Sequence, residues 1–171
     1  SIIKWNIIDI SGRDIYDIST KALTELQKID KIYDIVLIEN QPVQKNPKMK
    51  SIQMIIFTFF MFNKTCLGAN ITDVILMSAT RKNKYMFNFD ISVPDYKSKY
   101  TKCKKMSIEC TKYLLNNEGR WYDYFISHKK KDDLADSYLQ TLAYINHTPV
   151  LPNPPSPRSV SSNDSTTSTG D

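Results

Sequence analysis

Apolar and polar residues follow one another along this chain with two spacings, one typical of strands and one typical of helices. Runs rich in β-branched and other apolar residues predict buried strands over residues 2–10, 35–38 and 71–77. Apolar residues at helical spacing predict helices over residues 14–29, 47–62, 100–115 and 131–146. Residues 81–100 are expected to be irregular, and residues 116–127 to be a linker anchored by aromatic side chains. The order of these elements predicts an α/β domain with helices on both sides of a sheet.

The composition changes abruptly after residue 146. Residues 147–171 are rich first in proline and then in serine and threonine. Such a segment cannot bury enough apolar surface to offset the entropy lost on ordering. We therefore expect one folded domain over residues 1–146 and a disordered tail over residues 147–171.

Charge and cysteine usage narrow the functional classes. The 171 residues carry a formal net charge of +5, which suits a polyanionic partner. The three cysteines fit no zinc pattern, and two histidines are too few to complete one, so we expect reduced thiols inside a cell. The longest apolar run, residues 52–62, is shorter than the roughly 20 residues that a membrane-spanning helix needs. These features predict a soluble intracellular protein that does not enter a membrane.

Two groups of carboxylates occupy positions suited to ligand binding. Glu39 directly follows the strand predicted over residues 35–38, and ligands of open α/β sheets bind at the carboxyl ends of strands. Asp133 and Asp136 are three residues apart in the last predicted helix, so they share a face that borders its apolar stripe. A divalent cation would turn their repulsion into ligation. The alternative is that Glu39 is a solvated strand end and that the aspartates interact with the helix N-terminus.

Together, Glu39, Asp133 and Asp136 form a candidate site for one or two divalent ions. In two-metal nucleases the ions lie about 3.5–4 Å apart, where one activates a water molecule and the other stabilises the departing oxygen. Such chemistry needs no side-chain nucleophile, which agrees with the absence of a plausible Ser/His or Cys/His set in the sequence.

Three segments resemble motifs of the RuvC-like Holliday-junction resolvases of poxviruses, iridoviruses and related large DNA viruses. Residues 35–42 (IVLIENQP) resemble a strand that ends in the catalytic Glu and is followed by Gln-Pro. Residues 104–109 (KKMSIE) resemble a basic motif, and residues 131–137 (KDDLADS) resemble the last motif, in which the second Asp and the Asp three residues later bind metal. The Trp within residues 2–10 also matches a strand that follows the family's first motif.

The resemblance implies specific roles. Glu39, Asp133 and Asp136 would be catalytic carboxylates that bind Mg²⁺ or Mn²⁺, two ions per site, and Lys104 or Lys105 would be the active-site lysine. It also implies an RNase H-like, RuvC-type mixed sheet flanked by helices, and a homodimer that cuts opposed strands of branched double-stranded DNA. The family's first motif, a strand with an Asp before a Gly-containing turn, has no counterpart in this chain. We therefore expect the sheet to lack its first strand or strands and the site to lack one Asp.

Lysines surround these motifs and are candidate contacts for DNA phosphates. The candidates are Lys45, Lys48, Lys97, Lys99, Lys102, Lys129, Lys130 and Lys131. Neutralising phosphates releases counterions, so such binding falls steeply as salt is added. The alternative is that these lysines form a solvated basic surface. For residues 129–131 the sequence favours neither DNA contact nor this alternative.

The leading prediction is a metal-dependent endonuclease that resolves four-way junctions in viral DNA recombination and replication. It would act in the host-cell cytoplasm or in a viral replication compartment. One alternative is a nuclease of the same fold that acts on RNA–DNA hybrids or flaps. The other is a nucleic-acid-binding module with an incomplete site, which the missing first Asp favours.

Overall fold

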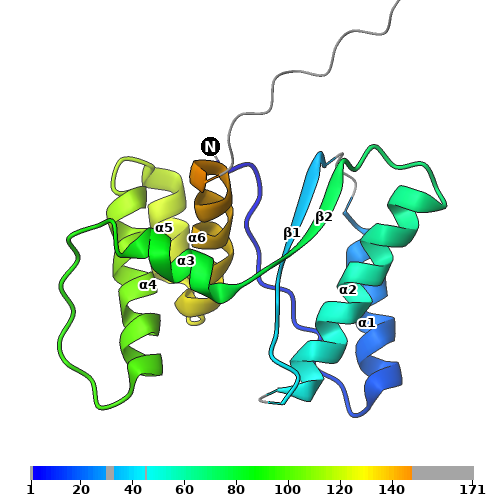
Figure 1. The fold of residues 1–171 in the computed structure, drawn as a ribbon, viewed down its shortest axis with the longest axis horizontal. Helices are drawn as coiled ribbons and strands as arrows, with labels where there is room; N and C mark the ends of the chain where they lie inside the picture. Colours follow the sequence, from blue (N-terminus) through cyan, green and yellow to red (C-terminus); the bar gives the residue numbers. More distant parts are fainter. Residues whose placement is uncertain (1, 30–32, 45, 148–171) are drawn as a thin grey trace, which may run out of the picture.

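The computed structural model describes residues 2–29, 33–44 and 46–147, and helices dominate it (Figure 1). In chain order the elements are α1 (Ile15–Gln27), β1 (Ile35–Glu39), α2 (Pro47–Thr65), β2 (Asp73–Met77), α3 (Ala79–Met86), α4 (Lys99–Leu115), α5 (Gly119–Ser127) and α6 (Lys131–His147). The strands predicted over residues 35–38 and 71–77 and the four predicted helices are therefore confirmed, with small shifts at their ends. Residue 45 and residues 148–171, where Lys45 and most of the expected disordered tail fall, lie outside the described residues.

Local sequence signals set where several helices begin. The Asp14 side chain accepts a hydrogen bond from the Asp17 amide at 2.9 Å and caps α1. Asn46 caps α2 by accepting from the Met49 amide, with Pro47 at the first helical position, where its missing N–H costs nothing. Ser78 caps α3 directly after β2 ends.

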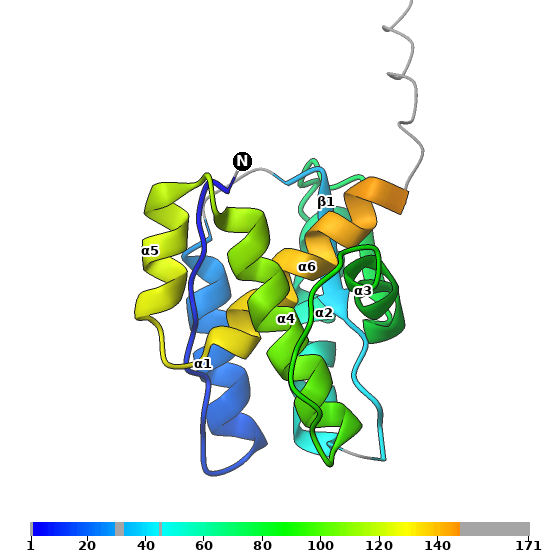
Figure 2. The same ribbon diagram turned by 90° about the vertical axis from the view of Figure 1, so that its left-hand side faces the viewer.

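The two strands form a parallel pair in which Ile35 is opposite Asp73 and Glu39 is opposite Met77. Parallel strands need a crossover connection, and α2 supplies it. The carboxyl ends of both strands consequently point to one end of the molecule, and α2 and α4 begin at that same end (Figures 1 and 2). Side chains at the ends of β1 and β2 therefore meet the first turns of helices.

The apolar side chains form two cores on either side of this small sheet. One lies between the strands and the α1–α2 pair, and its buried members are Leu26, Ile38, Phe60, Ile71 and Val74. The other lies among α3, α4, α5 and α6, where Met86, Cys110, Leu115, Phe125 and Leu139 are fully or almost fully buried. Met77, at the end of β2, belongs to this second core.

The prediction of a strand over residues 2–10 is wrong. The segment is extended but pairs with no strand of the described chain, and it runs alongside α5 (Figure 2). Trp5 fixes it there: its ring stacks on Phe125 at 5.6 Å between centroids, and its Nε1 donates to Ser137 Oγ at 3.0 Å. The apolar residues of this segment are thus partly used for packing against helices rather than for a sheet.

The expected RNase H-like mixed sheet is also wrong. Within the described residues the sheet has two strands, both parallel, and the structure is mostly helical. Two further segments predicted to lack regular structure contain helices: α3 occupies part of residues 81–100, and α5 occupies most of residues 116–127. In α5 the aromatic residues taken as linker anchors form an amphipathic helix that buries Phe125.

None of the helices in the described ranges is long and apolar enough to cross a membrane.

Candidate active site

A cavity of about 710 Å³ lies where β1, α3, α4 and α6 meet. β1 contributes Leu37 and Glu39, which are two residues apart and therefore point to the same side of the strand. The intervening Ile38 points the other way, into the core formed with α2. Alternation along β1 thus delivers the Glu39 carboxylate to the cavity.

Helix α6 supplies the facing wall. Asp133, Asp136 and Gln140 line the cavity, and their spacing of three and then four residues places them on one face of the helix. On the other side of α6, Leu134, Ala135 and Leu139 are buried in the helical core, so the helix cannot rotate this face away without exposing apolar surface. The sequence places Glu39 almost a hundred residues from the aspartates, and the fold brings them to one cavity.

Helix α3 contributes a buried cation to the same cavity. The Lys82 side chain is only 8% exposed, and its Nζ lies 2.5 Å from Oδ1 of Asp136. Lysine is almost never fully buried unless it is paired. The ion pair therefore joins α3 to α6 within the wall of the cavity.

Helix α4 contributes a second lysine. Lys104 Nζ lies 2.5 Å from Oδ2 of Asp132 and 5.0 Å from the centre of the Tyr100 ring. The hydrogen bond to Asp132 raises the pKa of Lys104, and the same bond lowers the pKa of Asp132. Both side chains are therefore charged at neutral pH.

Two other carboxylates of the cavity, Glu39 and Asp133, have pKa values shifted in the opposite direction. Burial raises the pKa of Glu39, and the negative charges of Asp136 and Asp133 raise it further, while the Lys82 charge lowers it. Burial also raises the pKa of Asp133, with Asp132 adding to the effect. A carboxyl group whose pKa is raised by burial beside like charges is stabilised by an added cation.

Gln140 presents an unsatisfied amide to this site. The residue is 6% exposed and lines the cavity, yet neither Nε2 nor Oε1 makes a hydrogen bond within the described part of the chain. The amide is close enough to Glu39 for its hydrogen-bonding interaction to lower the pKa of that carboxyl, although the geometry falls short of a formed hydrogen bond. Buried side-chain amides nearly always have partners, so an unpaired one at a cavity wall is suited to contact a bound ligand or water.

The donor chemistry of the cavity suits a hard divalent cation, because Mg²⁺ and Mn²⁺ prefer carboxylate and carbonyl oxygens. The arrangement is not a finished ion site: across residues 2–29, 33–44 and 46–147, no three Asp, Glu, His or Cys side chains stand close enough together to hold one metal ion. Asp132 and Asp136 are instead paired with lysines. Ligation by Asp136 would require this carboxylate to exchange Lys82 for the ion.

The structure separates the two candidates for the active-site lysine. Lys104 lines the cavity, whereas its neighbour Lys105 is exposed and is not part of the cavity wall. The four residues that the sequence pointed to most strongly, Glu39, Asp133, Asp136 and Lys104, are thus brought together, and Lys105 is not.

Most of the lysines expected to bind DNA lie on the surface around this end of the molecule. Lys48 is in the first turn of α2, Lys97 and Lys99 are exposed at the start of α4, and Lys129 and Lys130 are exposed directly before α6. Lys102 pairs with Asp95 at 2.8 Å, and Lys131 donates to the His128 carbonyl. These two lysines, and Lys48, which donates to the Gly12 carbonyl at 3.4 Å, therefore already have partners within the chain.

Two residues of the cavity were missed from sequence. Lys82 is not among the residues predicted for the site, although it lies shortly after the end of β2, which pairs with the strand that ends in Glu39. Gln140 is not among them either, although it continues the spacing of Asp133 and Asp136 along one helical face. Lys82 could be assigned to the site only once the pairing of β1 with β2 was known. Gln140 could be assigned only once the face of α6 that lines the cavity was known.

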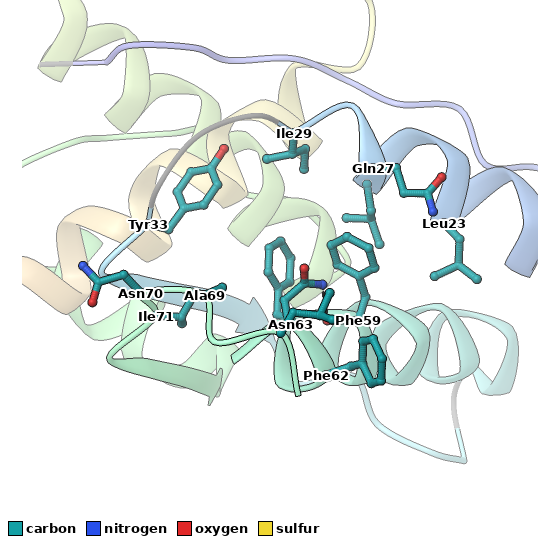
Figure 3. Close-up of a pocket in the computed structure, with 13 residues that line it drawn as sticks. Leu23, Gln27, Ile29, Tyr33, Phe59, Phe62, Asn63, Ala69, Asn70 and Ile71 are labelled. Atoms are coloured by element: carbon teal, nitrogen blue, oxygen red, sulfur yellow. Dashed lines mark hydrogen bonds between the residues drawn. The ribbon is translucent and has the colours of Figure 1, made fainter. Parts of the chain in front are cut away.

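A second cavity, of about 550 Å³, lies between α1 and α2 and differs in character (Figure 3). Its walls are mainly aliphatic and aromatic, and Leu23, Phe59 and Phe62 converge on it (Figure 3). Among the described residues that line it there is no Asp, Glu, Lys, Arg or His. Of these two cavities, the one at Glu39 is therefore the one with groups able to perform acid–base or metal chemistry.

Comparison with curated proteins finds a viral relative. A protein of Acanthamoeba polyphaga mimivirus, described as uncharacterized protein L451, is 38% identical to this chain over 135 residues. The match covers 70% of this chain and 32% of the relative, so the chain spans about a third of that protein's length. No family model matches the chain. No solved structure matches it.

Proposed function

We propose that this chain carries the acidic site of a metal-dependent, structure-selective endonuclease that cuts branched DNA at four-way junctions. The observation that carries the proposal is the convergence of Glu39 from β1 with Asp133 and Asp136 from α6 in one cavity. These are the carboxylates that resemble the catalytic set of the viral junction resolvases. The similarity to a mimivirus protein agrees with a viral setting, in which the enzyme would act in the host-cell cytoplasm or a replication compartment.

The residues of the cavity divide the work of phosphodiester hydrolysis. A bound Mg²⁺ or Mn²⁺ would supply an activated water and offset the charge of the reacting phosphate. Glu39 and Asp136, on separate elements, would hold the ion, and Asp133 would add a further carboxylate. Lys104, held charged by Asp132 near the cavity mouth, is placed to contact a phosphate.

The surrounding lysines supply affinity for the DNA backbone without reading sequence. Lys97 and Lys99 are exposed on the approach to Lys104, and Lys48 and Lys129 flank the same end. This placement favours a branched duplex as the ligand, because a branched duplex presents phosphates from more than one arm.

A homodimer would match the two-fold symmetry of a four-way junction. Exposed apolar side chains lie on α1 and α2, away from α6; they include Leu23, Met54 and Phe62. We propose this α1–α2 face as the dimer contact, because it leaves the acidic cavity free. Sedimentation at increasing concentration tests it, and a Phe62→Glu variant is expected to stay monomeric.

A second candidate function is nucleic-acid binding without catalysis. The two ion pairs favour it, because Lys82 and Lys104 already neutralise Asp136 and Asp132. In that case the cavity would stabilise the fold and the surface lysines would bind DNA.

Cleavage of end-labelled substrates in Mg²⁺ distinguishes these functions. The substrates are a synthetic four-way junction, a linear duplex of the same sequence and an RNA–DNA hybrid. We expect cleavage of the junction, with symmetric cuts, and little cleavage of the duplex. Preferred cleavage of the hybrid would make RNA–DNA hybrids, rather than junctions, the substrate class. Junction binding without cleavage in Mg²⁺ or Mn²⁺ would favour the non-catalytic binding module.

A further inference from the structure

The cation nearest to the carboxylates of the cavity belongs to the protein itself. Lys82 Nζ lies 2.5 Å from Asp136 Oδ1, and the Lys82 side chain is almost completely buried. Glu39 lines the same cavity as Lys82, and the Lys82 charge lowers the pKa of Glu39. A divalent ion shared by Glu39 and Asp136 would occupy this cavity too.

The ammonium and a divalent ion would compete for Asp136. A doubly charged ion within a few ångströms of Lys82 would be repelled by the ammonium, because like charges this close interact strongly at the effective dielectric of a protein surface. Without either cation, Glu39 and Asp136 would repel each other in a half-buried site. A nearby cation offsets this repulsion, and the chain supplies one, Lys82, when no metal is bound.

The Lys82 side chain can move away from Asp136. Its four-carbon stem is flexible and carries a point charge rather than a planar group that must be matched edge to edge. The cavity next to it holds about 710 Å³ and offers the ammonium room to move.

We propose that Lys82 is a positioning residue that holds Asp136 in the metal-free site and must release this carboxylate before a divalent cation binds. The inference rests on the proposed metal-dependent function, which it deepens by naming the group that the metal displaces. The metal and Lys82 then compete for one carboxylate, and the affinity for metal is set partly by the strength of the Lys82–Asp136 pair.

Metal affinity tests this competition without any measurement of cleavage. Mn²⁺ binding to the full chain is measured by calorimetry for wild type, Lys82→Met and Lys84→Met. Lys84 is the matched control, because it lies on the same helix and is exposed. We expect Lys82→Met to bind Mn²⁺ at least about tenfold more tightly, Lys84→Met to match wild type, and Asp136→Asn to lose the binding.

Chemical labelling of the wild-type chain gives a second readout that does not depend on a variant folding. An amine-reactive reagent and mass spectrometry report the labelling rate of Lys82 with and without Mn²⁺. We expect slow labelling without metal and labelling several times faster with it. Lys28, which pairs with Glu25 in α1, serves as the control and should not change.

The outcomes separate the two proposals. Equal or weaker Mn²⁺ binding by Lys82→Met, or labelling of Lys82 that metal does not change, would overturn the competition and leave the nuclease proposal standing. Failure of wild type and Lys82→Met alike to bind Mn²⁺ would overturn both.

Discussion

Lys104 Nζ lies 2.5 Å from Oδ2 of Asp132, and this pair joins α4 to α6 beside the cavity that contains Glu39. Asp132 is the first of two adjacent aspartates, and the pairing gives them different environments. Both line the cavity, but Asp132 is paired with Lys104, which lowers its pKa, whereas burial raises the pKa of Asp133. The order of the two aspartates therefore decides which one is available to a ligand.

The neighbouring lysines of α4 should differ in their effect on cleavage. Lys104→Met removes the charge beside the cavity and is expected to slow junction cleavage about 10²-fold, comparable to the loss of one preorganised donor in other enzymes. Lys105→Met removes an exposed charge outside the cavity and should change the rate by only a few fold. Single-turnover rates at saturating protein check this, and equal effects of the two variants would remove Lys104 from the site.

The exposed lysines before and at the start of α4 should contribute mainly electrostatic affinity. Replacing Lys97 or Lys99 with Ala is expected to weaken junction binding and to make the plot of log affinity against log salt shallower by about one unit for each lost phosphate contact. Electrophoretic mobility shifts at several salt concentrations measure the slope. Lys28→Ala, directly after α1, is the control. A slope unchanged in Lys97→Ala and Lys99→Ala would mean that DNA binds elsewhere on the protein.

Trp5 should be required for stability although it lies in a segment without regular structure. It stacks on Phe125 and is 7% exposed, so Trp5→Ala is expected to cost about 3–5 kcal/mol of the free energy of unfolding. Urea denaturation followed by circular dichroism measures the loss. Trp121→Ala, at a half-buried position of the same cluster, should cost less, and a small effect of Trp5→Ala would mean that residues 2–10 do not pack as described.

The three free cysteines should differ in reactivity and in their effect on alkaline stability. Burial raises the pKa of Cys110 from 9.0 to about 11, whereas Cys66 is exposed. Between pH 9 and 11 the unfolded chain loses this thiol proton while the folded chain keeps it, so the folded state loses stability as pH rises through this window.

Thiol titration with a disulfide reagent at pH 8 should show Cys66 reacting quickly and Cys110 reacting only after denaturation. The fall in the denaturation midpoint above pH 9 should be smaller in Cys110→Ala than in wild type. Rapid labelling of Cys110 in the native protein would contradict its burial.

The sequence predicted the elements whose apolar patterns are long and periodic. The structure brings Glu39, Asp133, Asp136 and Lys104, which the sequence singled out, to one cavity, and their roles stay predictions. The prediction from sequence failed where an apolar segment can pack either in a sheet or against helices. Residues 2–10 read equally well as a strand or as an extended segment packed on helices, and the Trp5–Phe125 contact, which spans 120 residues, decides between them. The wrong sheet followed from that error and from the resemblance.

The cavity itself could be predicted only in part. Carboxylates at a strand end and on a helical face are visible in the sequence, but the approach of Lys82 depends on how α3 packs against α6. That packing is set by Met86 and Leu139, which carry no chemical signal of their own.

The central claim is that carboxylates from two distant elements act as one site. Mg²⁺-dependent cleavage of a four-way junction by wild type, Glu39→Gln, Asp136→Asn and Asp123→Asn tests it most directly; Asp123 is an exposed residue of α5 outside the cavity. We expect wild type and Asp123→Asn to cut, and Glu39→Gln and Asp136→Asn each to lose cleavage while still binding the junction. Cleavage that persists at the wild-type rate in either cavity variant would contradict the claim.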